Sequence, residues 1–587
     1  MSIAADTRVT AAPRAHRLLR LPSAEGLFSA GVLVLVGVLV GIPTLAVLVM
    51  SLRQGLPGQA RPLTLANFAE VFSDPFTAHV MGNTLAFAAA AIGVTLLFAV
   101  PLVWLVTRTD LPGKETIYVL MTIGILIPVF LRVIGWILLF SPQIGIVNQA
   151  LMAALGLSEP PLNLYNVIGM AVTQGVSFVP AAFFMIVAAY RAIDPALEEA
   201  AYTSGASRLQ TVLRVNLPLT LPAILGVTVY LLMTAISVFE TPALLGLPSR
   251  TFVLSSAIYF AVTPQTGLPK YGLAATYGLI MMALGLLASY LYFRVVSESK
   301  KYAVISGKGY RPRLLELGRW KWLGLGFVAF YFALEIFLPL AALLWASLLP
   351  YLQVPSPAAL REVSLNNYLA LPNYVSWTPI LNTIILVLAA PTLTMLLSLA
   401  CSWVVVRSRS AVRGPLDTLA FLPHAIPSIV FAVALAWLAL SYRSWLPIYG
   451  SIVIIILAHT ISHLAYGTRT MNSTMIQVHS ELEEAGRLSG ANALQVFYRI
   501  LLPLVSPAIF NAWLWLALLS SREVTMALVL YAPSTEVLTT LVWKMWGSSW
   551  IGPVSALGVI LIAVVTAIVF VLRSMFTRFY RGAALSG

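Results

Sequence analysis

The sequence from Leu197 to Ile224 reads LEEAAYTSGASRLQTVLRVNLPLTLPAI, and that from Leu482 to Ile509 reads LEEAGRLSGANALQVFYRILLPLVSPAI. The two stretches align without a gap at an offset of 285 residues, and 16 of their 28 positions are identical. Such self-similarity indicates that the chain is built twice from one design. Weaker matches surround the repeat: Asn83-Thr84 with Asn382-Thr383, Ile127-Pro128 with Ile426-Pro427, and VLSSAIY from Val253 with VLTTLVW from Val537.

The composition places this repeat in a membrane protein. Of the 587 residues, 59% are hydrophobic and 10% are charged, whereas globular chains carry about 25% charged residues. The apolar residues form runs of roughly 20, the length at which a helix crosses a bilayer. Backbone groups in lipid must be satisfied internally, so we expect an all-α integral membrane fold. We predict twelve spans, at 28–51, 84–107, 116–140, 164–190, 221–246, 271–295, 322–348, 381–406, 415–440, 449–468, 505–531 and 552–576.

The repeat and the spans together define the predicted organisation. Each half holds six spans, and each copy of the repeat falls in the loop between the fourth and fifth span of its half, so both loops lie on the same side. The predicted segments are an N-terminal segment at 1–27, a first half at 28–296, a basic linker at 297–321 and a second half at 322–587.

The charges predict the orientation. With the N-terminus in the cytoplasm, the cytoplasmic segments hold 26 of the 35 Lys and Arg residues and the outward segments hold 7. This asymmetry follows the positive-inside rule, so we expect both termini in the cytoplasm of a bacterial cell, with the chain in its inner membrane. The densest basic cluster, at 294–321, is expected to touch anionic lipid, and its placement argues against nucleic acid as a partner. The single cysteine, Cys401, excludes an intramolecular disulfide.

The two loops share a local chemistry that predicts a bent helical pair. Gly205 and Gly490 follow a short helical stretch and can take the left-handed conformation that ends a helix. The next helix is expected to stop before Pro218 and Pro503, because proline disfavours helix in the residue before it. We call the resulting helix–glycine–helix unit an elbow.

Polar residues at equivalent positions predict the helix caps of the elbows. Ser207 and Asn492 follow the glycines and are expected to cap the second helix of each elbow. In the second copy, Ser480 and Glu483 have the spacing of a capping box at the start of the first helix.

The elbows resemble the EAA loop of binding-protein-dependent ABC importer permeases: Glu-Ala-Ala, three residues, Gly, nine residues, Ile, any residue, Leu-Pro. Val215 replaces the Ile in the first copy, and Gly486 replaces the second Ala in the second. The resemblance implies the type I importer permease fold and a coupling helix in each loop that fits a nucleotide-binding subunit. The residues to which it assigns this role are Glu199, Ala200, Ala201, Gly205, Leu209 and Pro218, and in the second half Glu484, Ala485, Gly490, Leu494 and Pro503.

The resemblance also implies the partners. Two copies of an ABC ATPase would bind the elbows, and a periplasmic or lipid-anchored solute-binding protein would deliver the solute. ATP and Mg would be bound by the ATPase and no cofactor by this chain, which is then not itself an enzyme; neither Gly113-Lys114 nor Gly307-Lys308 continues into a phosphate-loop pattern. The outward loops expected to dock the solute-binding protein lie at 52–82, 141–163, 246–270, 349–380 and 532–551.

Two further stretches resemble the fused ferric-iron importer permeases over essentially the whole chain. They are FETPALLGLPSRTFVLSSAIYF from Phe239 and SREVTMALVLYAPSTEVLTTLVW from Ser521. This resemblance implies ferric iron as the solute. Thiamine, polyamine and phosphonate permeases share much of the pattern and remain alternatives.

Four charged residues that fall within predicted spans are candidate functional residues: Arg132, Glu240, Arg522 and Glu523. A charge near the bilayer centre costs at least about 2.5–3.5 kcal/mol, so such residues face a cavity or each other. In the resembled family the fifth spans line the translocation path, which makes these residues candidates for the pathway or its gate. Interhelical ion pairs that hold the halves together are an equal alternative.

The sequence leaves three alternatives: a metal site, a secondary transporter and an intramembrane enzyme. His459 and His463 are four residues apart and share a helical face, but packing or a hydrogen bond is favoured over metal binding, and no metal site is predicted. A secondary transporter can also have two six-span repeats, but it does not explain the paired elbows. An intramembrane enzyme would need a catalytic constellation, to which only the histidine pair comes close.

Overall fold

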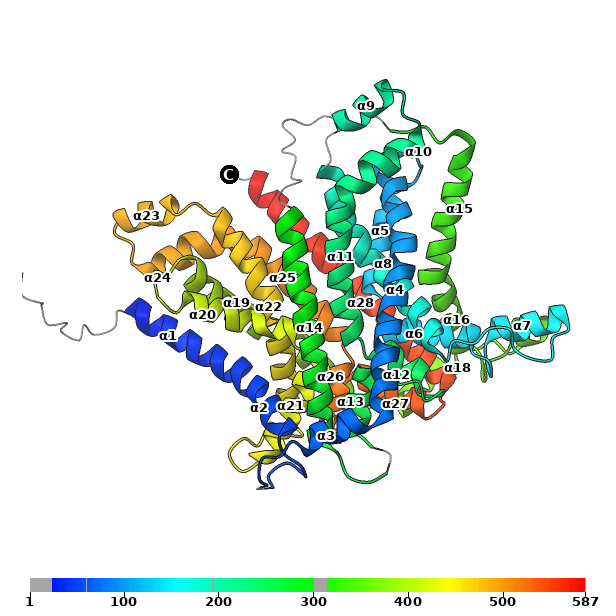
Figure 1. Ribbon diagram of the computed structural model, residues 1–587, viewed down its shortest axis with the longest axis horizontal. Coiled ribbons are helices and arrows are strands. Elements are labelled where there is room, and N and C mark those ends of the chain that lie inside the picture. Colours follow the sequence, from blue (N-terminus) through cyan, green and yellow to red (C-terminus); the bar gives the residue numbers. More distant parts are fainter. Residues whose placement is uncertain (1–23, 60, 193–194, 265, 300–313, 586–587) are drawn as a thin grey trace, which may run out of the picture.

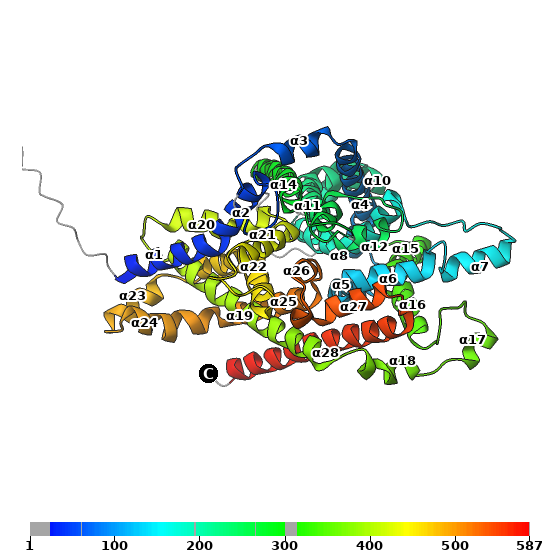
Figure 2. The same cartoon turned by 90° about the horizontal axis from the view of Figure 1, so that it is seen from below.

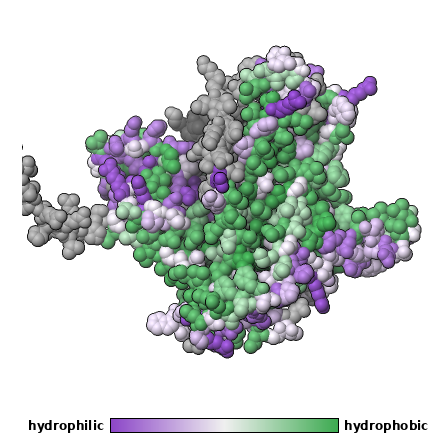
Figure 3. All heavy atoms as spheres, viewed as in Figure 1, coloured by the Kyte–Doolittle hydropathy of each residue, from purple (hydrophilic) through white to green (hydrophobic). Residues whose placement is uncertain are grey.

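The computed structural model describes residues 24–59, 61–192, 195–264, 266–299 and 314–585, and within these ranges the protein is built of helices (Figure 1). Ten helices are long and apolar enough to cross a membrane, or twelve spans result if each of two bent helix pairs is counted as one. The predicted all-α membrane fold is confirmed. Apolar side chains cover the flank of the helix bundle, whereas hydrophilic residues gather on the elbows and at the opposite end (Figure 3).

The helices of the first half follow the predicted order of spans. Short π-helical segments at Gly37–Gly41 and Val212–Asn216 join α1 to α2 and α10 to α11. The helices are α1 (Ala24–Val36), α2 (Ile42–Ser51), α3 (Ala66–Ser73), α4 (Pro75–Arg108), α5 (Lys114–Leu126), α6 (Val129–Phe140), α7 (Ile146–Leu155), α8 (Val167–Ala192), α9 (Pro195–Thr203), α10 (Arg208–Thr211), α11 (Leu217–Ser237), α12 (Glu240–Gly246), α13 (Leu254–Val262) and α14 (Tyr271–Ser299).

The second half repeats this order. Its π-helical segments lie at Ala333–Phe337 and Phe497–Leu501. The helices are α15 (Lys321–Phe332), α16 (Leu338–Ser347), α17 (Pro357–Arg361), α18 (Asn366–Leu369), α19 (Trp377–Val406), α20 (Arg413–Phe421), α21 (Ser428–Ser441), α22 (Ile452–Gln477), α23 (Glu481–Leu488), α24 (Ala493–Val496), α25 (Leu502–Arg522), α26 (Thr525–Val529), α27 (Leu538–Gly547) and α28 (Ile551–Leu585).

The third span of each half, predicted at 116–140 and 415–440, is sharply bent. The α5–α6 pair bends by 97° and the segment from α20 to α21 by 105°. Both bends lie at an Ile-Pro step, where Ile127 and Ile426 are extended, with ψ of 125° and 119°. Proline forces the residue before it out of the helical region, so the repeated Ile-Pro step sets both bends.

The fifth spans are also broken, against the continuous runs predicted at 221–246 and 505–531. In the first half α11 ends at Ser237 and α12 begins at Glu240. Pro242 explains this break, because a helix running through it would set the proline ring against the carbonyl of Val238. In the second half the corresponding break separates α25 from α26.

The first span of each half packs against both halves. Helix α2 contacts α14 of its own half and α21 of the other, and α1 contacts α19 and α20. Helix α16 likewise contacts α28 and, across the halves, α6. Figure 2 shows α2 beside α21 and α16 beside α6, so each first span lies against the other half. Most of the predicted linker at 297–321 lies outside the described residues, and the contacts show that the two halves do not pack as separate units.

The side of the molecule away from the elbows is built from short helices that the sequence had assigned to loops. Helices α13 and α27 occupy much of the segments predicted as loops at 246–270 and 532–551. The backbone N–H of Leu254 donates to Thr84 Oγ1 at 2.9 Å, and that of Leu538 donates to Thr383 Oγ1 at 2.8 Å. The repeated Asn-Thr pair at the start of the second spans thus caps the same helix in both halves.

Candidate functional site

The two elbows have the same backbone and lie on the upper side of the molecule in Figure 1. Gly205 ends α9 at φ +82° and Gly490 ends α23 at φ +87°. The N–H of Ala206 donates to the carbonyl of Ala201 at 3.0 Å, and the N–H of Ala491 donates to that of Gly486 at 3.1 Å. These are the six-to-one bonds of a Schellman turn, so the predicted role of the glycines in the fold is confirmed.

The second helix of each elbow is capped as predicted. Ser207 Oγ accepts from the N–H of Gln210 at 3.3 Å, and Asn492 Oδ1 accepts from that of Gln495 at 2.8 Å. Each glutamine side chain returns the bond, accepting from the N–H of the capping residue at 2.8 and 2.9 Å. The two elbows therefore carry the same reciprocal capping box.

Two predictions about the elbow helices are wrong. Ser480 makes no side-chain cap, because its own backbone is helical, with φ −62° and ψ −25°, and the Glu483 side chain pairs with Arg407. The helices also do not stop before Pro218 and Pro503, which lie in the first turns of α11 and α25. A π-helical segment precedes each proline, and its wider turn accommodates a residue that lacks an N–H and clashes with the carbonyl four residues back.

A buried arginine–glutamate pair fastens each elbow to the second span of its half. Arg108 Nε lies 2.6 Å from Glu198 Oε1, and Arg407 Nε lies 2.8 Å from Glu483 Oε1. Arg108 also donates to the carbonyl of Tyr190 at 2.9 Å, and Arg407 donates to carbonyls at the end of α22. We call these two pairs the elbow anchors.

The elbow anchors were missed by the sequence reasoning, which chose the next glutamate along the chain. Glu198 and Glu483 are buried, whereas Glu199 is half-buried and Glu484 is exposed. Burial raises the pKa of Glu198, and the nearby Arg108 opposes that rise. The available signal was an arginine at the end of the second span in both halves.

The remaining elbow residues predicted to meet a partner are mostly exposed. Ala200 and Ala485 are exposed, as is Leu494 with 65% of its surface accessible. Ala201 is half-buried. The side chain of Leu209 lies outside the described residues, and only its backbone, in α10, is placed. The described surface therefore offers a small side chain in each elbow and an exposed leucine in the second.

The four predicted intramembrane charges meet at one cavity between the halves. Arg132, Glu240, Arg522 and Glu523 all line a space of about 380 Å³, which we call the charged cavity. Its walls come from the bend of the first half's third span and from the breaks of both fifth spans. The bend at Pro128 and the breaks of the two fifth spans, of which only the first lies beside a proline, therefore bring the charges together.

Two arginines, one from each half, hold the carbonyl groups that the bend between α5 and α6 leaves free. Arg132 Nη2 donates to the carbonyl of Gly124 at 2.5 Å, and Arg522 Nη1 donates to that of Ile125. Arg132 Nη1 also lies 2.8 Å from Glu335 Oε1, and both side chains are almost fully buried. Positive charge is favourable at this C-terminal helix end.

Glu335 is a second residue that the sequence reasoning missed. It lies in the π-helical segment of the second half's first span and is fully buried. It is the only acidic residue in the apolar run predicted at 322–348, which was the available signal. Its pair with Arg132 joins the first span of one half to the third span of the other.

Glu523 and two histidines form a further polar group beside the charged cavity. Glu523 accepts from the backbone N–H of Met526 at 3.0 Å and lies 3.5 Å from His459 Nε2. The His459 and His463 rings are 5.7 Å apart. Among the described residues no group of three His, Cys, Asp or Glu side chains is placed to hold a metal ion.

Comparison with known proteins identifies the family. A model described as "Binding-protein-dependent transport system inner membrane component" matches residues 107–299 and 393–582. The ferric transport system permease FbpB of Actinobacillus pleuropneumoniae is 27% identical over 85% of this chain and 71% of its own length. The Fe(3+)-transport system permease FbpB 2 of Haemophilus influenzae is 23% identical over 87% and 91%.

One solved structure is similar to part of the chain. A bacterial alginate ABC transporter in complex with alginate pentasaccharide-bound periplasmic protein aligns with 42% of this chain and 85% of its own at 19% identity and a TM-score of 0.34. The family model occurs twice and together covers more than half of the sequence, once in each half. The chain therefore belongs to the inner membrane components of binding-protein-dependent transport systems, as a two-half, multi-pass permease of ABC importers.

Proposed function

We propose that this permease carries ferric iron into the cell, driven by two copies of a separate ATPase and supplied by a periplasmic or lipid-anchored solute-binding protein. Support for the solute comes from the names of several relatives, which are ferric transport permeases that match most of the chain. Support for two ATPase partners comes from the paired elbows.

The single observation that carries the ATPase partnership is that both elbows keep one shape down to their anchors. Lipid-facing helices need only be apolar, but these loops share the glycine turn, the capping box and the buried arginine–glutamate pair. Two surfaces of one shape suit two copies of one partner. ATP and Mg would bind to that partner, and this chain would perform no hydrolysis.

The elbow anchors give the coupling a physical route. A helix fastened by a buried ion pair moves with the span that holds its arginine, because separating the pair would leave an unpaired buried charge at a cost of about 3–5 kcal/mol. Movement of an ATPase against α9 would thus pass to α4, and movement against α23 to α19. The elbow side then faces the cytoplasm, with both termini.

The charged cavity is the proposed pathway or gate. Arg522 of the second half holds a carbonyl of the first, and the Arg132–Glu335 pair crosses the same boundary. A change in the relative position of the halves would have to rearrange these contacts. The same contacts also hold the halves together, so the gate and the structural ion pairs are one set of residues.

Reconstitution tests the proposal. The chain is placed in proteoliposomes with the ATPase and solute-binding protein of its own organism, and uptake of radiolabelled ferric iron is followed with and without ATP. We expect uptake that needs ATP and both partners, and that spermidine, thiamine and 2-aminoethylphosphonate do not compete. Uptake without the ATPase would indicate a secondary transporter, and ATP-driven uptake of a competitor instead would contradict the iron assignment.

A further inference from the structure

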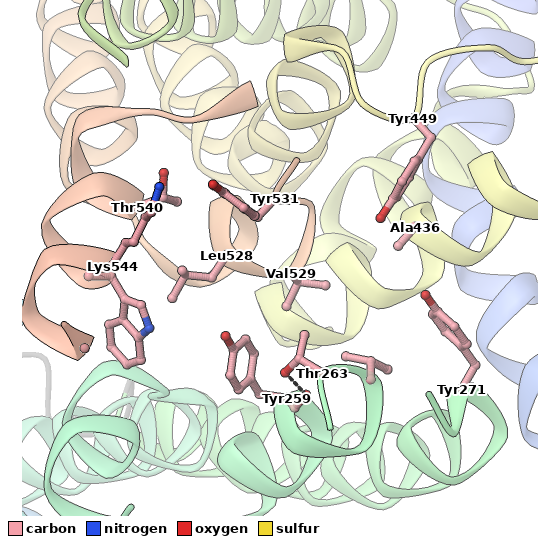
Figure 4. A pocket seen from close by; sticks show the side chains of 13 residues that line it. Tyr259, Thr263, Tyr271, Ala436, Tyr449, Leu528, Val529, Tyr531, Thr540 and Lys544 are labelled. Atoms are coloured by element: carbon pink, nitrogen blue, oxygen red, sulfur yellow. Dashed lines mark hydrogen bonds between the residues drawn. The ribbon is translucent and has the colours of Figure 1, made fainter. Parts of the chain in front are cut away.

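A second cavity lies on the side of the molecule away from the elbows, between the two halves. It measures about 520 Å³ and is lined by residues of α13, α14, α21, α26 and α27 (Figure 4). None of the residues predicted from the sequence as pathway or gate lines it. We call it the aromatic vestibule.

The lining of the aromatic vestibule is rich in hydrogen-bond donors. Tyr259, Tyr271, Tyr449 and Tyr531 contribute phenol groups, and Lys544 contributes an ammonium group. In Figure 4 the hydroxyls of Tyr271 and Tyr449 point toward one another, while those of Tyr259 and Tyr531 point toward the side of α27.

No carboxylate is among the described residues that line the aromatic vestibule. The nearest charged neighbour of Lys544 is Glu536, whose Oε1 lies 3.5 Å from the Lys544 Nζ. The same carboxylate oxygen accepts from the hydroxyl of Tyr531 at 3.4 Å. Glu536 is thus held behind the lining, and the groups turned to the space are donors.

A small aromatic cluster separates the aromatic vestibule from the charged cavity. Phe239, at the break of the first half's fifth span, lines the charged cavity and is fully buried. Its ring centroid lies 5.0 Å from that of Tyr259 and 5.9 Å from that of Trp543, both of which line the aromatic vestibule. We call these three side chains the aromatic septum.

Two helices connect the cavities along the same line. On α21, Ser428 lines the charged cavity and Ala436 lines the aromatic vestibule, eight residues further on. On α26, Thr525 lines the charged cavity and Leu528 lines the aromatic vestibule. The two spaces therefore follow one another between the halves, with the aromatic septum at their boundary.

We propose that the aromatic vestibule and the charged cavity are consecutive chambers of one solute path, and that the aromatic vestibule binds a solute that presents anionic oxygen atoms: ferric iron carrying oxyanion ligands. The nature of the solute rests on the proposed function; the chamber order does not. Phenol and ammonium groups donate hydrogen bonds to anionic oxygens. A bare polycation would meet Lys544 and no lining carboxylate, which disfavours polyamines.

Cysteine labelling tests the chamber order and the charge preference without a solute. The chain has one cysteine, Cys401, which is fully buried, so we expect little labelling of the natural sequence. Thr263→Cys places a thiol in the aromatic vestibule and Ser428→Cys places one in the charged cavity. Membrane-impermeant anionic and cationic thiosulfonates are added to sealed vesicles on the side of the aromatic vestibule. The labelling rate of the introduced cysteine by each reagent is divided by the rate at which the same reagent labels a free thiol in solution.

We expect Thr263→Cys to react about two- to fourfold faster with the anionic reagent, because one unit charge at about 10 Å in water changes the two rates about twofold in opposite directions and Glu536 offsets part of the charge of Lys544. Lys544→Gln should remove this preference. Lys270→Gln is the matched control: its side chain is equally exposed and also paired with a glutamate, but it lies outside the aromatic vestibule. Equal rates, or a faster cationic reagent, would overturn the charge preference.

Ser428→Cys should react from the vestibule side only when Phe239→Ala opens the aromatic septum. Phe260→Ala, which removes a ring in contact with Tyr259 but lining neither cavity, should leave it unreactive. Phe239→Leu provides a milder variant if the alanine does not fold. Reaction at Ser428→Cys with the septum intact, or none after it is opened, would overturn the chamber order.

Protection from labelling tests which solute occupies the aromatic vestibule. Ferric citrate should slow labelling of Thr263→Cys, whereas spermidine should not; no protection by ferric citrate would overturn the ferric–oxyanion occupant. A reconstituted permease that moves no iron would instead contradict the proposed function, so the two failures are distinct.

Discussion

The two halves of the chain match closely at their elbows and less closely at their bent third spans. At the elbows both halves keep the same glycine turn, capping box and anchor. At the bends they keep the backbone, with angles of 97° and 105°, but not the charges. Phe431 stands in the second half where the first has Arg132, counted from the Ile-Pro step.

The partner of Arg132 shows the same asymmetry. Counted from the π-helical segments of the first spans, Leu39 in the first half corresponds to Glu335 in the second. One junction between first and third spans is therefore a buried ion pair, and its counterpart is apolar. Two identical surfaces fit two copies of one partner, whereas a single solute crossing between the halves gives no reason for its path to be symmetric.

The largest effect is expected when the ion pair between Arg132 and Glu335 is replaced by the apolar residues found at the equivalent positions of the other half. Glu335→Leu alone leaves the charge of Arg132 buried without a carboxylate to pair with, and we expect a loss of about 3–5 kcal/mol in the free energy of unfolding. The double variant Arg132→Phe with Glu335→Leu removes both charges, and buried pairs replaced by apolar residues are often as stable as before. Thermal unfolding in detergent compares the two; equal destabilisation would contradict the pairing.

The elbow anchors should respond alike in the two halves. Arg108→Met and Arg407→Met each leave a buried glutamate without its partner, and we expect each to lower ATP hydrolysis stimulated by the solute-binding protein at least tenfold. The first should be the more damaging, because its pair is the more buried. Arg409→Met, on an arginine outside the anchors, is the control. A defect in only one half would break the proposed equivalence.

The elbow glycines should show a smaller conformational penalty. Gly205→Val and Gly490→Val force a β-branched residue to positive φ, at about 1–2 kcal/mol each, although a Cβ there meets no atom within 4 Å. We expect increased proteolysis at the affected elbow and weaker ATPase binding, with the spans intact. Gly318→Val, at positive φ outside the elbows, controls for the conformational cost alone.

The smallest effect is expected at the caps. Ser207→Ala and Asn492→Ala each remove one side-chain acceptor at a helix start, at a cost of about 1 kcal/mol. Hydrogen exchange at the following amides should accelerate about fivefold in both elbows. A change at one elbow and none at the other would indicate that the matched caps do not have matched roles.

The sequence predicted the parts of the fold that depend on local chemistry. Span number and type follow from apolar length, and Gly205 and Gly490 follow from the repeated turn. The bends were missed because an apolar run has the same composition straight or bent, although the Ile-Pro steps marked them. The breaks of the fifth spans were hidden in the same way.

The sequence named four charged residues of the candidate site but not the residues that pair with them. Arg132, Glu240, Arg522 and Glu523 were chosen because charge is costly in lipid, and the structure brings all four to one cavity. Glu335 and the elbow anchors depend on contacts between residues 76 to 203 positions apart, which periodicity and spacing do not encode. The aromatic vestibule, assembled from five helices of both halves, left no local signal.

The most direct test of the account is the number of ATPase subunits bound by one chain. Native mass spectrometry of the purified complex should give two ATPase copies per permease, falling to one when Gly205→Val or Gly490→Val alters a single elbow and to none when both are altered. A complex that keeps two copies with both elbows altered, or a permease that transports with no ATPase bound, would contradict the account.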